Sequence, residues 1–232
     1  MKKMMESEEG ELLEHSRGHE LHDAETAYVA QLSLAWEALH CQYSQLCKKL
    51  AFDQGNDTCY NQTAQLYQQF HVLLQRFVEN EPFEPGGRVE VYARSRIASP
   101  NLLQVPNIKG NAREEADLVT AEDLLRVVET CVLSFHLFVT TEKRKPGGNH
   151  LHRDLIQIQS AAEKKKMKLK EMCRKSGGWK KESWRRIGSN MELLFALVDT
   201  EVILRVSRMM TITKEQLHWC EEKMKKLELA DG

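Results

Sequence analysis

The stretch from Asn190 to Leu229 constrains the fold of this chain most, because it has the pattern of a two-sided apolar helix followed by a second helix. The first of these helices begins near Met191 and holds two apolar stripes at helical spacing. One stripe consists of Met191, Phe195, Val198, Val202 and Met209, and the other of Leu193, Leu197 and Leu204. A helix that is apolar on two sides must pack between neighbours. We therefore predict that it forms the centre of a helical core.

A capping box marks the start of the second helix. Thr213 is followed three residues later by Gln216. In this motif the threonine oxygen accepts a hydrogen bond from the backbone N–H three residues on, and the glutamine side chain reaches back. The pattern predicts a helix that begins at Lys214.

Helical spacing of apolar residues predicts four more helices earlier in the chain. Asp23 is the expected cap of the first, and Thr120 opens the third. A short turn around Gly55 favours an antiparallel hairpin of the first two helices. No strand-rich region interrupts this pattern, so the predicted class is all-α, a helical bundle of about six helices. The four segments are 23–51, 66–80, 120–138 and 155–173.

The segment 81–119 breaks the helical pattern between the second and third helices. Pro82, Pro85 and the Gly86-Gly87 pair stop a helix, and Pro100 and Pro106 act against a new one. Val89, Val91 and Ile97 indicate extended chain. We predict one long, extended, proline-containing strap, an uncommon length of connection that is often functional.

The composition, with 41% hydrophobic and 29% charged residues, is that of a globular protein. Residues 1–20 are acidic and lack a helical period, so we expect a disordered lead. Residues 21–229 are predicted to form a single helical domain, followed by a tail at 230–232. Six scattered cysteines and the absence of a secretory signal or a long apolar run favour the cytoplasm or the nucleus.

The basic segment 163–186 is the strongest candidate for ligand binding. It carries 11 Lys and Arg residues against 3 Asp and Glu, although the whole chain has a net charge of −1. The basic residues could neutralise phosphates while two tryptophans stack on bases, or they could face acidic elements of the same protein. The candidate polyanion-binding residues are Lys164, Lys165, Lys166, Lys168, Lys170, Arg174, Lys175, Trp179, Lys180, Lys181, Trp184, Arg185 and Arg186.

Motifs for catalysis or cofactor binding are missing from the sequence. We find no phosphate-binding glycine loop, nucleophile elbow or zinc-protease helix, and we predict no catalytic residue, metal or cofactor. His15, His19 and His22 do not have the spacing of a zinc-protease helix. Asp199 and Glu201 interrupt the apolar helix. They would form either a buried acidic site or, as we favour, a polar seam in which Glu201 pairs with Arg205.

Ser99 is a candidate phosphorylation site within the predicted strap. It precedes Pro100 and follows Arg96. We expect a phosphate on Ser99 to find Arg94 and Arg96 nearby.

Four ordered blocks resemble a plant family that is catalogued as domain of unknown function 1666. Its members are often labelled large-subunit ribosomal-protein-like, and they are usually longer, so this chain would correspond to their shared module. The resemblance implies that the strap is ordered along the bundle, anchored by Leu102, Leu103, Val105 and Ile108, and it brings no catalytic residues. The blocks are AYVAQL with WEAL from Ala27, VYARSRIASPNLLQVPNIKG from Val91, LFALVDTEVILRVSRM from Leu194 and QLHWCEEKM from Gln216.

These observations favour a non-catalytic interaction or scaffold module whose partner is another protein that docks on a helix groove. The alternative is association with RNA or the ribosome through the basic segment.

Overall fold

The computed structural model describes residues 2–52, 58–112, 119–142, 153–175 and 188–229. These residues form seven α-helices, one 3-10 turn at Glu81–Phe83 and a two-stranded antiparallel pairing of two residues each. The all-α helical bundle is confirmed. The elements are α1 Lys2–Phe52, β1 Thr58–Cys59, α2 Asn61–Asn80, α3 Arg88–Ala98, β2 Asn111–Ala112, α4 Ala121–Thr140, α5 Arg153–Lys175, α6 Gly188–Ser207 and α7 Lys214–Leu229.

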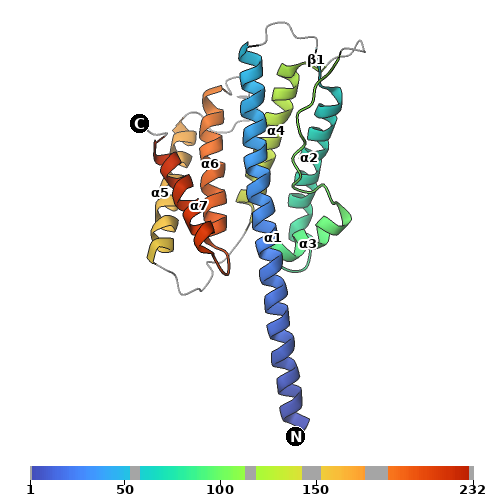
Figure 1. Cartoon of the computed structure of the whole chain (residues 1–232), viewed down its shortest axis with the longest axis vertical. Helices are drawn as coiled ribbons and strands as arrows, with labels where there is room; N and C mark the ends of the chain where they lie inside the picture. The colour runs from blue at the N-terminus through green and yellow to red at the C-terminus, as the bar shows by residue number, and fades with distance from the viewer. Residues whose placement is uncertain (1, 53–57, 113–118, 143–152, 176–187, 230–232) are drawn as a thin grey trace.

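Helix α6 lies at the centre of the bundle, as its two apolar stripes predict (Figure 1). Both stripes are in contact with neighbouring helices, and the last third of α6 is buried on every side. The capping box of α7 is also confirmed. The backbone N–H of Gln216 donates to Thr213 Oγ1 over 3.2 Å, and the N–H of Thr213 donates to Gln216 Oε1 over 2.8 Å.

Helix α1 begins at Lys2, which corrects the expected disordered lead and the expected start at Asp23. Its N-terminal part continues beyond the bundle as a projecting helix (Figure 1). The first twenty residues lack an apolar face but are rich in Glu, Leu, Lys and Met, which have high helix propensity. A helix propagates more easily than it nucleates, so the packed part of α1 can extend into such a segment.

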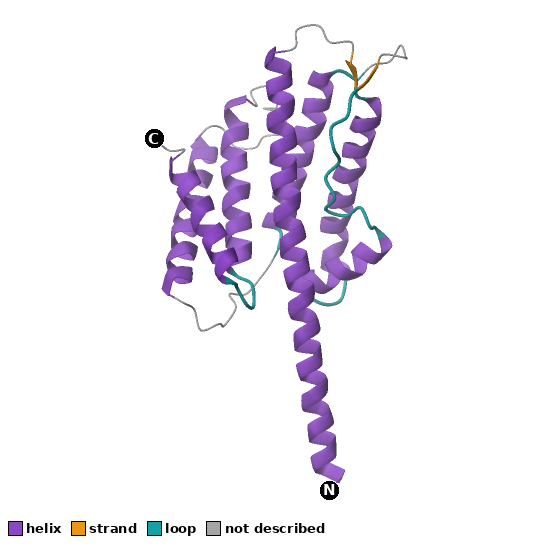
Figure 2. Cartoon of the chain, viewed as in Figure 1, coloured by secondary structure: helices purple, strands orange, loops and turns teal. Residues whose placement is uncertain are grey.

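The first two long helices do not pack directly on each other as a simple hairpin. The strap that follows α3 lies between them and bonds to both (Figure 2). From α1, Gln31 Nε2 donates to the Leu103 carbonyl over 2.8 Å. From α2, Tyr67 Oη donates to the Pro106 carbonyl over 2.9 Å, and Thr63 Oγ1 to that of Lys109 over 2.6 Å. The carbonyl groups of the extended strap therefore accept hydrogen bonds from side chains of α1 and α2. In a helix the same carbonyl groups would be bonded within the helix.

The predicted strap is confirmed from residue 99 to residue 112 but not before residue 99, and residues 113–118 lie outside the described part of the chain. Leu102 and Leu103 are buried, and Val105 and Ile108 pack against the core, as the resemblance implied. Residues 88–98, in contrast, form helix α3 instead of extended chain. The glycines that end one helix permit the start of the next, because Gly86 adopts a φ of 100°. The Glu90 carboxylate then accepts the N–H of Gly87 over 2.7 Å and caps α3.

The return of the strap makes α2 and α4 parallel neighbours. Tyr60 N donates to the Val119 carbonyl over 3.0 Å where both helices begin, and Phe77 meets Phe138 at 5.1 Å between ring centroids where both end. No helix in the described part of the chain is both long enough and apolar enough to cross a membrane.

Candidate functional site

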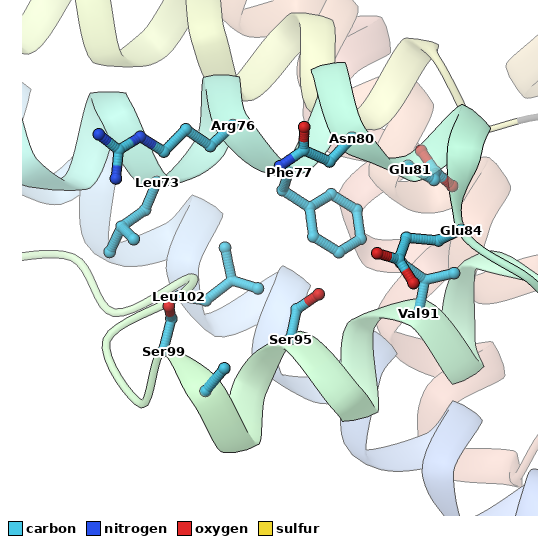
Figure 3. Close-up of a pocket in the computed structure, with 11 residues that line it drawn as sticks. Leu73, Arg76, Phe77, Asn80, Glu81, Glu84, Val91, Ser95, Ser99 and Leu102 are labelled. Carbon is cyan, nitrogen blue, oxygen red and sulfur yellow. The ribbon is translucent and has the colours of Figure 1, made fainter.

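A groove of about 210 Å³ lies between the C-terminal half of α2 and helix α3 (Figure 3). Its floor is apolar and is formed by Phe77, Val91 and Leu102. These three side chains are buried, so the floor is part of the core surface and not a mobile rim. Leu73 and Ala98 continue the apolar lining on the two sides.

The width of the groove is set by a buried ion pair at its closed end. Arg88, at the start of α3, pairs with Glu81 at the end of α2, and only 4% of the Arg88 side chain is exposed. The same guanidinium donates to the Phe138 carbonyl and, over 2.9 Å, to Thr141 Oγ1. Charge-assisted hydrogen bonds of this kind fix geometry strongly. They hold α3 against both α2 and α4.

Polar residues line the groove from both walls. Arg76 and Asn80 come from α2, and Ser95 and Ser99 come from α3 and its end (Figure 3). The side chains of these four make no hydrogen bond or ion pair with another residue that the structure describes. They are thus available to a ligand.

The free charge in the groove is positive. Two carboxylates also line it, but Glu81 is neutralised by Arg88 and Glu84 lies 3.8 Å from the Arg94 guanidinium. Arg76 has no such counter-charge in the described structure. An apolar floor beside an uncompensated guanidinium suits a group that is both apolar and anionic.

A second cavity of about 200 Å³, lined by Glu25 and Glu142, lies over a buried ionic network. Arg205 contacts both carboxylates, with its Nη2 3.1 Å from Glu25 Oε1 and its Nε 2.8 Å from Glu142 Oε1. Tyr28 Oη donates to Glu142 over 3.0 Å, and Met210 N donates to Glu25 over 2.7 Å. Because each carboxylate already accepts at least two such contacts, the network ties α1 and α6 together instead of presenting a reactive group.

Asp199 and Glu201 form links between helices, which agrees with a polar seam. Asp199 accepts a hydrogen bond from the Trp36 indole over 2.7 Å, and burial raises the pKa of Asp199. Glu201 pairs with Lys166 of α5 at 2.9 Å. The expected pairing of Glu201 with Arg205 is wrong, because the Arg205 side chain reaches α1.

The structure divides the basic segment into inward and outward residues. Lys165 is buried and donates to the Leu227 carbonyl over 2.8 Å, while Lys166 pairs with Glu201. These two lysines hold α5 to α7 and α6. Trp179, Lys180, Lys181, Trp184, Arg185 and Arg186 lie outside the described residues. The exposed cations are Lys164, Lys168, Lys170, Arg174 and Lys175.

Two lysines of α5 affect a histidine of α4. Burial, together with the charges of Lys170 and Lys166, lowers the pKa of His136 to about 4. His136 is therefore neutral at pH 7.

Ser99 lies where α3 ends, and the two arginines that we expect near a phosphate on it already have contacts within the fold. Arg94 donates to the Pro85 carbonyl and lies near Glu84, and Arg96 donates to the Leu102 carbonyl. Both guanidinium groups therefore hold the ends of α3 in place. Arg76, the arginine that lines the groove, has no side-chain partner among the described residues.

Other groups that could support chemistry are engaged within the fold. His71 Nδ1 lies 2.6 Å from Ser134 Oγ, but that hydroxyl donates to the Thr130 carbonyl over 3.1 Å. The serine proton is thus directed away from the histidine, which is the reverse of what an activated nucleophile needs. Among the described side chains, no group of three or more His, Cys, Asp or Glu residues could hold a metal ion.

Sequence reasoning missed the groove because it did not predict α3. The signal was present in Gly87 followed three residues later by Glu90, with Val91, Ser95 and Ala98 at helical spacing. The prolines and glycines on either side of this segment favoured extended chain instead of a helix. Without α3 as the second wall, Arg76 was an ordinary exposed arginine on α2.

Comparison with known proteins gives one family assignment. Neither the curated proteins nor the solved structures contain a significant match to this chain. A family model described as "Protein of unknown function (DUF1666)" matches residues 22–232. This match starts within α1 and covers every other element of the bundle, including both walls of the groove. The chain therefore belongs to the DUF1666 family of proteins of unknown function.

Proposed function

We propose that this chain is a non-catalytic interaction module that binds a partner protein through the groove between α2 and α3. The observation that carries the proposal is the free guanidinium of Arg76 beside a buried apolar floor. The partner would be an exposed peptide segment with a large apolar residue close to an aspartate or a glutamate. The apolar side chain would enter the groove while the carboxylate binds Arg76 in a bidentate manner.

The size and the rim of the groove support a peptide ligand. A cavity of about 210 Å³ is smaller than the roughly 300–1,000 Å³ typical of small-molecule sites, and it has room for one or two side chains. Large apolar side chains nearby are left in solvent, with Phe83 89% and Ile97 85% exposed. Phe83 precedes the groove residue Glu84, and Ile97 precedes Ala98. Exposed apolar side chains that flank a pocket are typical of protein interaction sites.

The proposal is tested by selecting displayed peptides on the immobilised full-length chain. We expect the enriched sequences to combine an acidic residue with a large apolar residue two or three positions away. The Arg76→Gln variant should weaken the Kd of a selected peptide about tenfold or more, equivalent to about 1.4 kcal/mol. Isothermal titration calorimetry measures this change.

The matched control is Arg126→Gln. Arg126 is an exposed arginine in the second turn of α4, at the end of the bundle opposite the groove. This variant should bind the peptide as the unmodified chain does. Equal affinities for Arg76→Gln and the unmodified chain would show that the groove is not the peptide site.

We keep association with RNA as a second candidate, because five cations of the basic segment are exposed on α5. If α5 binds RNA, the triple variant Lys164→Glu, Lys168→Glu and Lys170→Glu should lose at least tenfold in affinity, and binding to unmodified chain should weaken steeply with added salt. Lys165 and Lys166 are left unchanged because they hold helices together. Fluorescence anisotropy with a labelled single-stranded RNA measures both effects.

The control for α5 is a triple variant of exposed lysines on other helices, namely Lys48→Glu, Lys214→Glu and Lys226→Glu. It changes the net charge equally. If both triple variants lose the same affinity, the binding depends on overall charge and not on α5. Absence of RNA binding at low salt would remove this candidate.

A further inference from the structure

We propose that Ser99 is a phosphorylation site and that Arg76, across the groove, binds the phosphate. Ser99 lies directly after the last residue of α3. Its φ and ψ are −133° and 82°, so the chain has left the helix at this residue. The neighbouring Ile97, Ala98 and Pro100 are exposed. Ser99 itself is half-buried, and its position beyond the last residue of α3 leaves it outside the helix.

The backbone around Ser99 is held while its hydroxyl is free. The N–H of Ser99 donates to the Ser95 carbonyl over 2.8 Å, and the Ser99 carbonyl accepts the N–H of Leu102 over 3.0 Å. The hydroxyl itself has no bonded partner among the described residues. Phosphorylation would thus break no hydrogen bond that the fold needs.

The transfer requires a serine/threonine protein kinase and ATP. The Ser99 Oγ attacks the γ-phosphorus of ATP, an O–P bond forms, and the bond between this phosphorus and the bridging oxygen of ADP breaks. The hydroxyl proton passes to the base of the kinase. Arg96 three residues before Ser99 and Pro100 directly after it match the two commonest kinase preferences, for a basic residue and for a following proline.

The structure favours Arg76 as the phosphate partner by elimination and by position. Arg94 and Arg96 already bond to backbone carbonyls, whereas Arg76 has no described partner. Arg76 and Ser99 line opposite walls of the same groove (Figure 3). A phosphate with a charge near −2 would gain charge-assisted hydrogen bonds from the free guanidinium. If the groove binds a peptide as proposed above, the phosphate takes the place of the peptide carboxylate and closes the site.

The first part of the test asks whether the folded chain is a substrate. The full-length protein is incubated with ATP and either a proline-directed kinase or a kinase that selects arginine at the third preceding position. Mass spectrometry should locate phosphate on Ser99 and find none there in Ser99→Ala. Ser95→Ala is the matched control, because it removes the other groove serine, and it should be modified normally.

A peptide of residues 92–104 serves as the reference substrate. If the peptide is phosphorylated and the folded chain is not, Ser99 is inaccessible and the proposal is wrong. If neither kinase class modifies the peptide, the sequence is not a kinase target and the proposal is equally wrong.

The second part of the test asks whether Arg76 binds the phosphate. A ³¹P NMR titration of the phosphorylated chain should give a second phosphate pKa at least half a unit below the value of about 6 for free phosphoserine. In the Arg76→Gln variant this pKa should return towards that value, whereas Arg126→Gln should leave it low. An unchanged titration in Arg76→Gln would overturn the pairing. Neither readout needs a bound peptide, so the peptide proposal and the phosphate proposal can fail independently.

Discussion

Replacement of Arg205 by methionine is expected to destabilise the fold by about 3–5 kcal/mol, the usual cost of removing one partner of a buried ion pair. Only 5% of the Arg205 side chain is exposed, and it lies between the carboxylates of Glu25 and Glu142, which are 1% and 7% exposed. Without the guanidinium, two buried negative charges lose their compensation. Denaturation with urea, followed by circular dichroism, measures the change in unfolding free energy.

The loss of stability in Arg205→Met should depend on pH. In Arg205→Met the two carboxylates stay buried without a positive partner, and a buried negative charge costs more free energy than a buried neutral group. At low pH protonation makes the carboxylates neutral, so this cost is smaller there than at high pH. The variant should therefore be closer to the unmodified chain at pH 5 than at pH 8.

Two further variants separate this explanation from simple loss of packing. Arg208→Met removes an arginine whose side chain is 32% exposed and paired with Glu163, and it should cost less than about 1 kcal/mol. Adding Glu25→Gln and Glu142→Gln to Arg205→Met should recover part of the stability. If Arg205→Met costs no more than Arg208→Met, the buried network does not support the fold.

Replacement of Trp36 by alanine is the second large effect, with an expected loss of about 3–5 kcal/mol. Trp36 is 1% exposed and joins three helices. Its ring centroid lies 5.5 Å from those of Phe135 in α4 and Phe195 in α6, and its indole N–H donates to Asp199 over 2.7 Å. Alanine would leave a cavity where α1, α4 and α6 meet. Urea denaturation followed by circular dichroism measures this loss of unfolding free energy.

Trp36→Phe separates the hydrogen bond from the packing. Phenylalanine keeps an aromatic ring but leaves the buried Asp199 without the indole donor, a loss of about 1–3 kcal/mol. The indole bond lowers the pKa of Asp199 against the effect of burial, so this pKa should rise further in the variant. The loss of unfolding free energy in Trp36→Phe, relative to the unmodified chain, should then grow as the pH rises. Trp219→Ala, at a partly buried position on α7, is the control, and an equal loss there would contradict the central role of Trp36.

The helices were predictable where apolar spacing and caps agreed. Thr213 with Gln216 marked the start of α7, and Thr120 with Asp123 marked that of α4. Helix α3 was not predictable, because Pro85 and Gly86 only indicate that the preceding helix ends. Either extended chain or a new helix can follow such a break. The groove depends on α3, so its binding residues could not be recognised without the structure.

Ion pairs also differ between what the sequence spacing predicts and what the fold contains. Along the sequence, Arg205 has Glu201 at the spacing of a helical pair, yet in the fold it contacts Glu25 and Glu142. A spacing rule considers neighbours on one helix surface, where such a pair contributes a few tenths of a kcal/mol. Burial between helices makes the choice of partner worth several kcal/mol, and the partners come from distant parts of the chain.

The sequence alone determined the all-α class, most of the helix boundaries and the central place of α6, because periodicity and capping are local properties. Only the tertiary structure decided that the strap separates α1 from α2, which lysines of α5 point inward, and that Arg76 and Ser99 line opposite walls of one groove. Those relations join residues far apart in the chain, and they follow from how helices and extended segments share the limited space around one core.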